Sequence, residues 1–392
     1  MRKIKVLHII TRLILGGAQE NTLYTIEGLE KAGKYDVRLL TGPPLGPEGE
    51  LLKYCREKGI KYNIFSQLRR NISPLRDATS FFELVFFLKK NKFDIVHTHS
   101  SKAGIIGRIA AHYAKVPVII HTVHGLPFHD YQAEALNKFY ISLERKAAKY
   151  TDYIFCVAKA MIEKCVKNNI APRDKFCLVR SGFKVEPFLY AKKDILLQRK
   201  LGISPNDIVI GKVARLFDLK GHKYLIAAFR EVLAKHPNSK LLLVGDGILK
   251  ETLMAQAEEL GIRERVIFAG LVPPEKVADY IAQMDILVHA SLREGLAKVI
   301  PQALLMGKPV ISFDIDGAGE LIVHKTTGML TKPEDISELT DSINYIIENE
   351  AKANMMAIRG KKLALSLYPV DRMIAQIDEL YSYALNKKGI NE

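Results

Sequence analysis

Short runs of Val, Ile and Leu alternate along the chain with longer stretches of helical periodicity, and this alternation restricts the fold more than any other feature. Such runs, with no polar alternation, are typical of parallel strands buried on both faces of a sheet. The stretches between them are long enough for crossover helices. The sequence predicts a doubly wound α/β fold with parallel strands, which in the first half are residues 5–10, 36–41, 95–98, 118–122 and 153–157.

The same pattern restarts in the second half, which indicates a second α/β domain. The expected strands there are residues 207–213, 240–245, 266–270, 286–289 and 309–312. A chain of 392 residues also exceeds the usual size of one domain. The polar stretch 184–204 has no strand pattern and suits a connection beside an interdomain cleft. We therefore predict domains at residues 1–185 and 186–368.

The last segment, residues 369–392, is predicted to contain a helix that packs back on the first domain. Its apolar positions recur at helical spacing, so another part of the protein must cover them. These positions are Met373, Ile374, Ile377, Leu380, Tyr381 and Leu385.

The cysteines and the absence of a long apolar stretch in the sequence indicate a cytoplasmic protein. Cys55, Cys156, Cys165 and Cys177 have neither zinc-like nor framework spacing, so we expect free thiols in a reducing compartment. The apolar run near the start is interrupted by His8 and Arg12 and is better explained as a first strand than as a signal peptide.

The basic charge is concentrated in the first half. Residues 1–185 contain 31 Lys and Arg against 16 Asp and Glu, which accounts for the whole net charge of +15. Such polarity suggests an anionic partner, either a membrane surface or a phosphate-linked acceptor; a basic surface that only aids solubility is the alternative. A nucleic-acid partner is disfavoured, because no recognised DNA- or RNA-binding module is present.

Two motifs, one of glycines and one of basic residues, could bind phosphate. Gly16 and Gly17 follow the first predicted strand and precede a helix, where backbone amides can approach an anion; a plain turn is the alternative. The complete dinucleotide fingerprint is missing, which disfavours an NAD-dependent enzyme. Arg215 and Lys220 follow the first strand of the second domain and suit a diphosphate, although two solvated basic residues would give the same pattern.

These cations and the motifs that follow them resemble those of the family 4 glycosyltransferases of the GT-B fold. The resemblance covers nearly the whole chain. The resemblance rests on the Arg215 and Lys220 pair, a Gly245-Asp-Gly turn, the Glu294-Gly pair opening a helix, and the Gly307-Lys-Pro-Val-Ile segment. It implies two facing Rossmann-like domains, with a nucleotide-sugar donor bound mainly by the second, the acceptor by the first, and domain closure. It also implies a retaining, metal-independent reaction without an organic cofactor.

The resemblance assigns roles to individual residues. Arg215 and Lys220 would bind the donor diphosphate, to which the backbone amides at Gly16 and Gly17 are also expected to contribute, and Glu294 would orient the donor sugar as a catalytic group. The other expected contacts to sugar or nucleotide are Gly295, Leu296, Ala297, Val299, Gln302 and Gly270. Gln302 departs from the family, which has a second glutamate there; an amide keeps a hydrogen bond to a ribose hydroxyl but loses the carboxylate's charge.

Four histidines follow two neighbouring predicted strands. His97, His99, His121 and His124 are expected at one edge of the sheet, where a metal site is conceivable. No acidic ligand run accompanies them, and the resemblance implies no metal, so we predict none. By the same resemblance His124, followed by Gly125, is the active-site histidine beside the donor sugar; a strand-end histidine capped by the backbone is the alternative.

Residues 80–92 combine aromatic side chains with a basic end. Interfacial helices have this composition, which suggests peripheral contact with an anionic membrane at the inner face of the plasma membrane. A core-facing helix with solvated lysines at its C-terminal end is the competing interpretation, which we prefer.

The sequence therefore predicts a glycosyltransferase that moves a sugar from a nucleoside diphosphate to a lipid-linked or saccharide acceptor, in cell-envelope or polysaccharide synthesis. Two other functions stay open. Gln302 would suit a non-catalytic partner of the same fold, and a sugar-nucleotide epimerase would share the architecture but need no acceptor.

Overall fold

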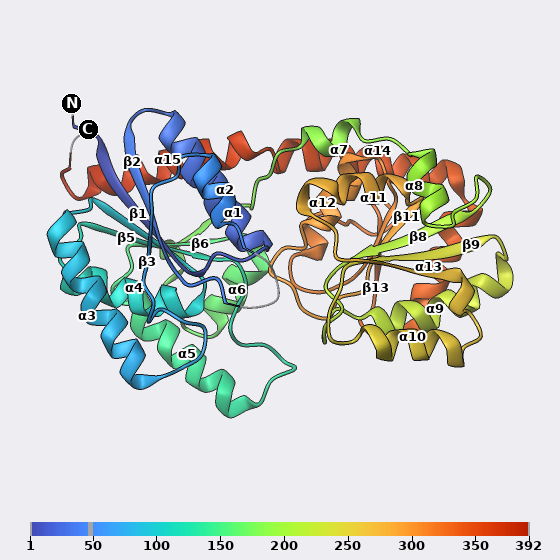
Figure 1. Cartoon of the computed structure of the whole chain (residues 1–392), viewed down its shortest axis with the longest axis horizontal. Helices are drawn as coiled ribbons and strands as arrows, with labels where there is room; N and C mark the ends of the chain where they lie inside the picture. Colours follow the sequence, from blue (N-terminus) through green and yellow to red (C-terminus); the bar gives the residue numbers. More distant parts are fainter. Residues whose placement is uncertain (1, 46–49, 391–392) are drawn as a thin grey trace. The chain divides into compact units, whose positions relative to one another are not determined.

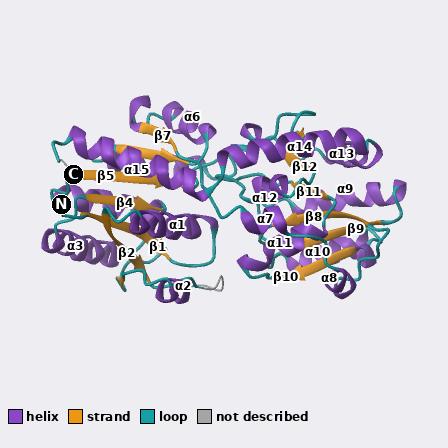
Figure 2. Cartoon of the chain, turned by 90° about the horizontal axis from the view of Figure 1, so that it is seen from above, coloured by secondary structure: helices purple, strands orange, loops and turns teal. Residues whose placement is uncertain are grey.

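The computed structural model describes residues 2–45 and 50–390. The chain forms two compact units: unit 1 runs to Phe183 and resumes at Pro369, and unit 2 comprises Lys184–Tyr368. The observed boundary lies two residues before the expected one. Each unit contains a parallel sheet with helices on both faces (Figures 1 and 2).

Unit 1 contains a seven-stranded parallel sheet in the order β3-β2-β1-β4-β5-β6-β7. This order, with its reversal beside β1, is that of a doubly wound fold. The strands are β1 (Ile4–Arg12), β2 (Tyr35–Gly42), β3 (Tyr62–Ile64), β4 (Ile95–His99), β5 (Val118–Val123), β6 (Tyr153–Cys156) and β7 (Phe176–Leu178).

Alternate residues of the unit 1 strands belong to two different cores. Val6 and Ile10 face a cluster with α1, α2 and α15, whereas Leu7 and Ile9 face a cluster with α3 and α4. Successive side chains of a strand point to opposite faces, so both faces are apolar. The helices are α1 (Gly17–Lys31), α2 (Leu52–Glu57), α3 (Pro74–Asn91), α4 (Ser101–Tyr113), α5 (Glu134–Ala148), α6 (Lys159–Lys167) and α15 (Val370–Lys387), with a 3₁₀ turn, η1 (Arg173–Lys175).

Helix α15, drawn in red at the end of the chain in Figure 1, is part of unit 1 and packs against α1. Its buried residues are Met373, Ile377, Tyr381, Ala384 and Leu385. Gly28 permits close packing of α1 here, because a Cβ at that position would lie 2.1 Å from Ile374 Cδ1. The C-terminal helix therefore completes the core on one face of the first sheet.

Unit 2 contains a six-stranded parallel sheet in the order β10-β9-β8-β11-β12-β13. Its strands are β8 (Ile208–Val213), β9 (Ser239–Val244), β10 (Val266–Gly270), β11 (Ile286–His289), β12 (Val310–Phe313) and β13 (Met329–Thr331). Its helices are α7 (Glu186–Tyr190), α8 (Ile195–Lys200), α9 (His222–Lys235), α10 (Lys250–Glu259), α11 (Val277–Gln283), α12 (Val299–Leu305), α13 (Ile336–Glu348) and α14 (Glu350–Leu367), with 3₁₀ turns η2 (Arg263–Arg265), η3 (Pro274–Lys276) and η4 (Ala318–Glu320).

The predicted α/β fold with two parallel sheets is confirmed, with local differences. Strands β3, β7 and β13 were not predicted; each lies at a sheet edge and has three residues, too few for a clear strand pattern. The polar stretch 184–204 was expected to be a simple connection, but it contains α7 and α8 and belongs to unit 2. Asp194 explains one of these helices, since its Oδ1 accepts hydrogen bonds from the N–H groups of Leu196 and Leu197.

Across residues 2–45 and 50–390, none of the helices combines the length and the apolar character that crossing a membrane requires.

Candidate active site

Two cations lie in the loop that joins β8 to α9 of unit 2. Arg215 is exposed and its guanidinium lies over the ring of Phe217, 5.0 Å from the centroid. Lys220 is half-buried, and its Nζ lies 2.6 Å from Oε1 of Glu294. Gly221 adopts a positive φ of 68°, and a Cβ there would meet the carbonyl oxygen of Ala290 at 1.7 Å. A glycine is therefore required where this loop enters α9.

Glu294 lies in the loop between β11 and α12, with its side chain 19% exposed. Its Oε1 lies 3.3 Å from Nε2 of His289, in addition to the contact with Lys220, and its N–H donates to Oδ2 of Asp316 at 2.8 Å. Burial acts to raise the pKa of Glu294, but Lys220 and His289 outweigh it and hold the pKa well below its usual value. Glu294 is therefore ionised at neutral pH.

A small cavity of about 10 Å³ adjoins Glu294. It brings together Glu294, Gly295, Leu296 and Ala297 from the predicted sugar site with residues after β12. The lining is His289, Glu294, Gly295, Leu296, Ala297, Ile300, Ile315, Gly317, Ala318 and Leu321. Backbone and carboxylate groups thus converge at the carboxyl ends of β11 and β12, where open α/β sheets bind ligands.

Other predicted donor contacts do not line this cavity. Val299 is buried and begins α12, so the helix starts five residues after Glu294 and was wrongly expected to open at the Glu-Gly pair. Gln302 is half-buried within α12. Gly270 ends β10 with a φ of 73°, and its carbonyl oxygen accepts a hydrogen bond from Gly245. Their roles as ligand contacts stay predictions.

Lys212, on β8, was not identified from the sequence. Its side chain is fully buried, and Nζ has no hydrogen-bond partner in the described part of the chain. Burial lowers the pKa of Lys212 to about 7; Glu294 opposes this shift and Lys220 adds to it. The sequence did contain a signal for a buried lysine. Lys212 lies within the run Ile208–Val213, which shows no alternation of polar and apolar residues and is therefore expected to be buried on both faces.

In unit 1, Gly16 and Gly17 lie where β1 passes into α1. Gly17 is the first residue of the helix, and the carbonyl oxygen of Gly16 accepts from the N–H of Glu20. A Cβ on Gly16 would approach Oε1 of Gln19 to 2.8 Å. Gly16 and Gly17 thus belong to unit 1, whereas Arg215 and Lys220, the other predicted diphosphate contacts, belong to unit 2.

His124 follows β5 and lines a cavity of about 260 Å³ in unit 1. Ser100 and Ser101, at the start of α4, also line this cavity. The complete lining is Ala18, Ser100, Ser101, His121, Thr122, Val123, His124, Gly125, Leu126, Pro127, Phe128, Glu144, Ile154, Cys165, Ile170 and Phe176. His124 therefore lies at a hollow formed by the carboxyl end of the first sheet.

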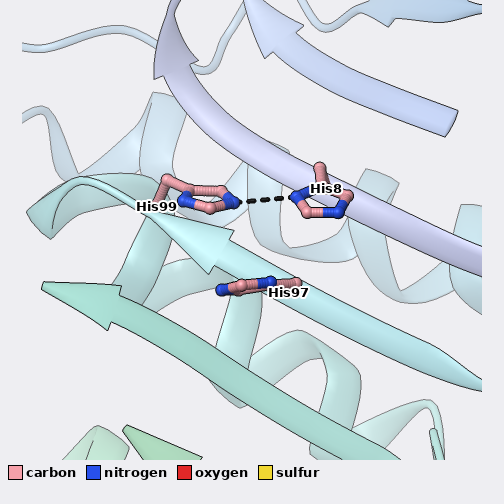
Figure 3. A group of neighbouring side chains, drawn as sticks. All are labelled: His8, His97 and His99. Carbon is pink, nitrogen blue, oxygen red and sulfur yellow. Dashed lines mark hydrogen bonds between the residues drawn. The ribbon is translucent and has the colours of Figure 1, made fainter. Parts of the chain in front are cut away.

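The histidines of β4 and β5, which the sequence predicts at one edge of the sheet, do not all lie on one face of it. His97 and His99 share one face of β4, and His8 of β1 is in register with His97, so these three rings lie together (Figure 3). His121 lies on the opposite face, where Nδ1 is 3.1 Å from the carbonyl oxygen of Thr98. The strand alternation could have shown this, because positions 97 and 99 pair with 120 and 122, not with 121.

His8, His97 and His99 are also close enough to ligate one metal ion, since their ligand atoms lie within 4.8 Å of one another. Their ring nitrogens nevertheless have protein partners. Nδ1 of His8 lies 2.8 Å from Nε2 of His99, as Figure 3 shows, and both nitrogens of His97 contact hydroxyl groups. A hydrogen-bonded cluster accounts for this arrangement without an ion.

Comparison with known proteins gives two matches to family models. The model "Glycosyl transferases group 1" matches residues 194–363, and the model "Glycosyltransferase Family 4" matches residues 15–186. The matched segments correspond closely to units 2 and 1 of the structure.

Individual relatives agree with these models. The chain is 30% identical over 383 residues to the UDP-Gal:alpha-D-GlcNAc-diphosphoundecaprenol alpha-1,3-galactosyltransferase of Escherichia coli, covering 97% of each chain. It is 26% identical to the capsular polysaccharide biosynthesis glycosyltransferase CapM of Staphylococcus aureus, over 82% of this chain and 84% of CapM. The Anabaena protein HepE has the same fold, with a TM-score of 0.81 at 23% identity over 97% of this chain and all of HepE. This chain therefore belongs to the family 4 glycosyltransferases and is a glycosyltransferase of the GT-B fold.

Proposed function

We propose that this glycosyltransferase moves a hexosyl residue from a uridine diphosphate sugar to a saccharide carried on a polyprenyl diphosphate, in the synthesis of a cell-envelope glycan. The observation that carries the proposal is the Glu294 carboxylate held between Lys220 and His289 beyond the carboxyl end of β11. The relative from Escherichia coli, named for UDP-Gal and a diphosphoundecaprenol acceptor, supports the substrate classes, because similarity extends over 97% of both chains.

The proposed roles follow from charge and position. Arg215 and Lys220 stabilise the negative charge that develops on the leaving diphosphate, which removes the need for a metal ion or an organic cofactor. Gly16 and Gly17 offer backbone amides to the same group. Glu294, ionised at neutral pH, accepts hydrogen bonds from hydroxyl groups of the donor sugar, and His124 lies beside the reacting centre.

The donor sugar and nucleotide contacts are completed by the loop after Glu294 and by α12. Gly295, Leu296 and Ala297 line the cavity next to the carboxylate. Gln302 on α12 accepts a hydrogen bond from a ribose hydroxyl, with less strength than a carboxylate would have. The reaction retains the anomeric configuration of the donor, as the family resemblance implies.

The function is tested by incubating the purified protein with uridine, guanosine and adenosine diphosphate sugars and with a GlcNAc-diphosphate lipid. We expect release of uridine diphosphate that requires the lipid, with UDP-galactose the first donor to examine, and a product with retained configuration by NMR. Donor binding without turnover, restored in Gln302→Glu, would instead identify a non-catalytic partner. A new nucleotide sugar formed without acceptor would identify an epimerase.

Membrane contact through α3 is part of the proposal. Leu84 and Leu88 of this helix are buried in unit 1, but Leu75, Phe82 and Phe86 are 84%, 69% and 71% exposed. The helix thus has a core face, as the preferred interpretation expected, and an apolar outer stripe. Lys89 and Lys90 extend the stripe with positive charge, which suits an anionic lipid surface that carries the acceptor.

The double variant Phe82→Ser/Phe86→Ser should bind vesicles of anionic phospholipid roughly tenfold more weakly or worse, because two exposed rings no longer enter the interface. Sedimentation with vesicles measures the change. The control is Tyr190→Ser/Ile358→Ser, which removes two side chains of unit 2 that are 75% and 64% exposed. Equal binding by the wild type and both variants would contradict membrane contact through α3.

A further inference from the structure

A continuous chain of hydrogen bonds connects the C-terminal helix to His124 through the interior of unit 1. The hydroxyl of Tyr381, on α15, lies 2.5 Å from Nδ1 of His97 and 3.4 Å from Nε2 of His8. Nδ1 of His8 lies 2.8 Å from Nε2 of His99, and Nδ1 of His99 lies 3.0 Å from Nε2 of His124. Both ring nitrogens of His8 and of His99 are therefore used.

The strand geometry explains why these side chains meet. His8 and His97 are paired residues of β1 and β4, and His99 lies two positions further on the same face. Thr122 of β5 pairs with His99. Its Oγ1 lies 2.7 Å from Nε2 of His97, the ring nitrogen that does not face Tyr381. Helix α15 covers this face of the sheet, so the hydroxyl of Tyr381 reaches both His8 and His97.

The three central histidines are neutral at physiological pH. Burial lowers the pKa of His8 to about 3, and it lowers the pKa values of His97 and His99 well below the usual value, with neighbouring histidines adding to the shift. A neutral imidazole has one donor and one acceptor nitrogen. In a chain of such rings the choice at one member fixes the choice at the next, because two donors or two acceptors cannot share a hydrogen bond.

With every contact of the chain made as a hydrogen bond between neutral rings, two arrangements are consistent, and the distances favour one of them. If Tyr381 donates to His97, the phenolic oxygen accepts from Nε2–H of His8, and His99 and His124 each donate through Nε2–H to the preceding ring. If Tyr381 donates to His8, every ring carries its proton on Nδ1 instead. The contact of the hydroxyl to His97 is shorter by 0.9 Å, which favours the first arrangement.

We propose that Tyr381, His8 and His99 are positioning residues that fix the tautomer of His124, so that its ring carries a proton on Nε2, the nitrogen that faces Nδ1 of His99. The buried chain also resists a cationic ring, because a charge moved inward would be desolvated. The catalytic consequence rests on the proposed role of His124, whereas the tautomer itself does not.

His121 gives an internal reference for this proposal. Its Nδ1 lies 3.1 Å from the carbonyl oxygen of Thr98 and 2.9 Å from Oγ1 of the same residue, whose hydroxyl donates to the carbonyl oxygen of Ile120 at 3.3 Å. Both oxygens of Thr98 therefore face Nδ1 as acceptors, which favours a proton on Nδ1 of His121. Burial lowers the pKa of His121 well below the usual value, so this ring is neutral too. One spectrum should therefore contain both tautomers at assigned positions.

Ring-nitrogen NMR of protein labelled with ¹⁵N-histidine, at pH 7.5, tests the proposal directly. We expect the Nε2–H tautomer for His8, His97, His99 and His124, and the Nδ1–H tautomer for His121, with signals assigned from single His→Gln variants. A mixture of tautomers among the four coupled rings, or the Nδ1–H form at His124, would overturn the proposal. So would a stoichiometric metal ion in the purified protein that shifts the signals of His8, His97 and His99.

Tyr381→Phe removes the hydroxyl at the start of the chain and keeps the ring. Its His124 signal should move toward an average of both tautomers, and kcat should fall roughly twofold to tenfold because part of the population carries the wrong tautomer. The matched control is Tyr35→Phe: the Tyr35 hydroxyl bonds Asp378 of the same helix, and its ring packs edge-on against Tyr381 at 6.0 Å. Equal His124 signals in both variants would overturn the coupling.

The two proposals fail separately. Coupled tautomers in a protein that does not transfer sugar would leave the hydrogen-bond chain intact and contradict the proposed function. Sugar transfer together with a His124 tautomer that is unaffected by Tyr381→Phe would support the proposed function and contradict the coupling through the hydrogen-bond chain.

Discussion

Replacing Glu294 with alanine should lower kcat for sugar transfer by roughly 10²–10³-fold, the usual loss for one preorganised group that acts on the reacting sugar. The carboxylate lies 2.6 Å from Nζ of Lys220 and 3.3 Å from Nε2 of His289, so its removal also leaves two basic groups without their common partner. The lysine can then shift toward the donor diphosphate. Donor affinity should therefore change less than kcat, which initial rates of uridine diphosphate release would show.

Two further variants separate the charge of Glu294 from its size. Glu294→Gln keeps the shape and one acceptor oxygen, so a comparable loss of kcat in this variant would assign the effect to the negative charge. Glu275→Ala removes an exposed carboxylate of the same unit and should transfer sugar at the wild-type rate. Wild-type turnover by Glu294→Ala, with the fold intact by circular dichroism, would exclude Glu294 from the reaction.

The sequence was sufficient for the architecture because Val, Ile and Leu predominate in the long parallel strands. Strands such as β1 and β8 are buried on both faces and keep this character, although β1 contains Lys5 and His8 and β8 contains Lys212. The edge strands β3 and β13 escaped prediction for the opposite reason. Each pairs along one side only, and three residues contain too little pattern to distinguish a strand from a loop.

The site was only partly predictable, because motif spacing gives positions along the chain and not partners across it. Glu294 and Lys220 were both identified, but nothing in the sequence showed that they form an ion pair at 2.6 Å. Tyr381 was recognised only as an apolar position of the last helix. Its contact with His97 joins residues 284 positions apart and depends on how α15 packs, which single-sequence periodicity does not contain.

Lys212 gives the second large effect, this time on stability. Its buried ammonium has no hydrogen-bond partner in the described residues, and a methionine of similar length would fill the space without a charge. Lys212→Met should therefore raise the free energy of unfolding near pH 7 by roughly 1–4 kcal/mol, as when buried charges are replaced by apolar groups. Thermal unfolding measures it, with Lys240→Met as control: this variant removes a lysine of β9 that lies 3.5 Å from Asp207 and should bring no gain.

The dependence of this gain on pH identifies its cause. The pKa of Lys212 is about 7 in the folded protein and near 10.5 in the unfolded chain, so between these values the unfolded chain binds more protons and the wild type becomes more stable as pH rises. Lys212→Met lacks this contribution. Its advantage should hence shrink by about 1.4 kcal/mol per pH unit between pH 7 and pH 9.

A constant advantage would mean that Lys212 keeps its charge when folded, and a less stable variant would mean that the charge is compensated. The expected shrinkage would instead show that Lys212 loses its proton near pH 7 in the folded protein. An anionic donor bound nearby would favour the protonated lysine, so sugar transfer by Lys212→Met should be slower than that of the wild type despite the greater stability of the variant.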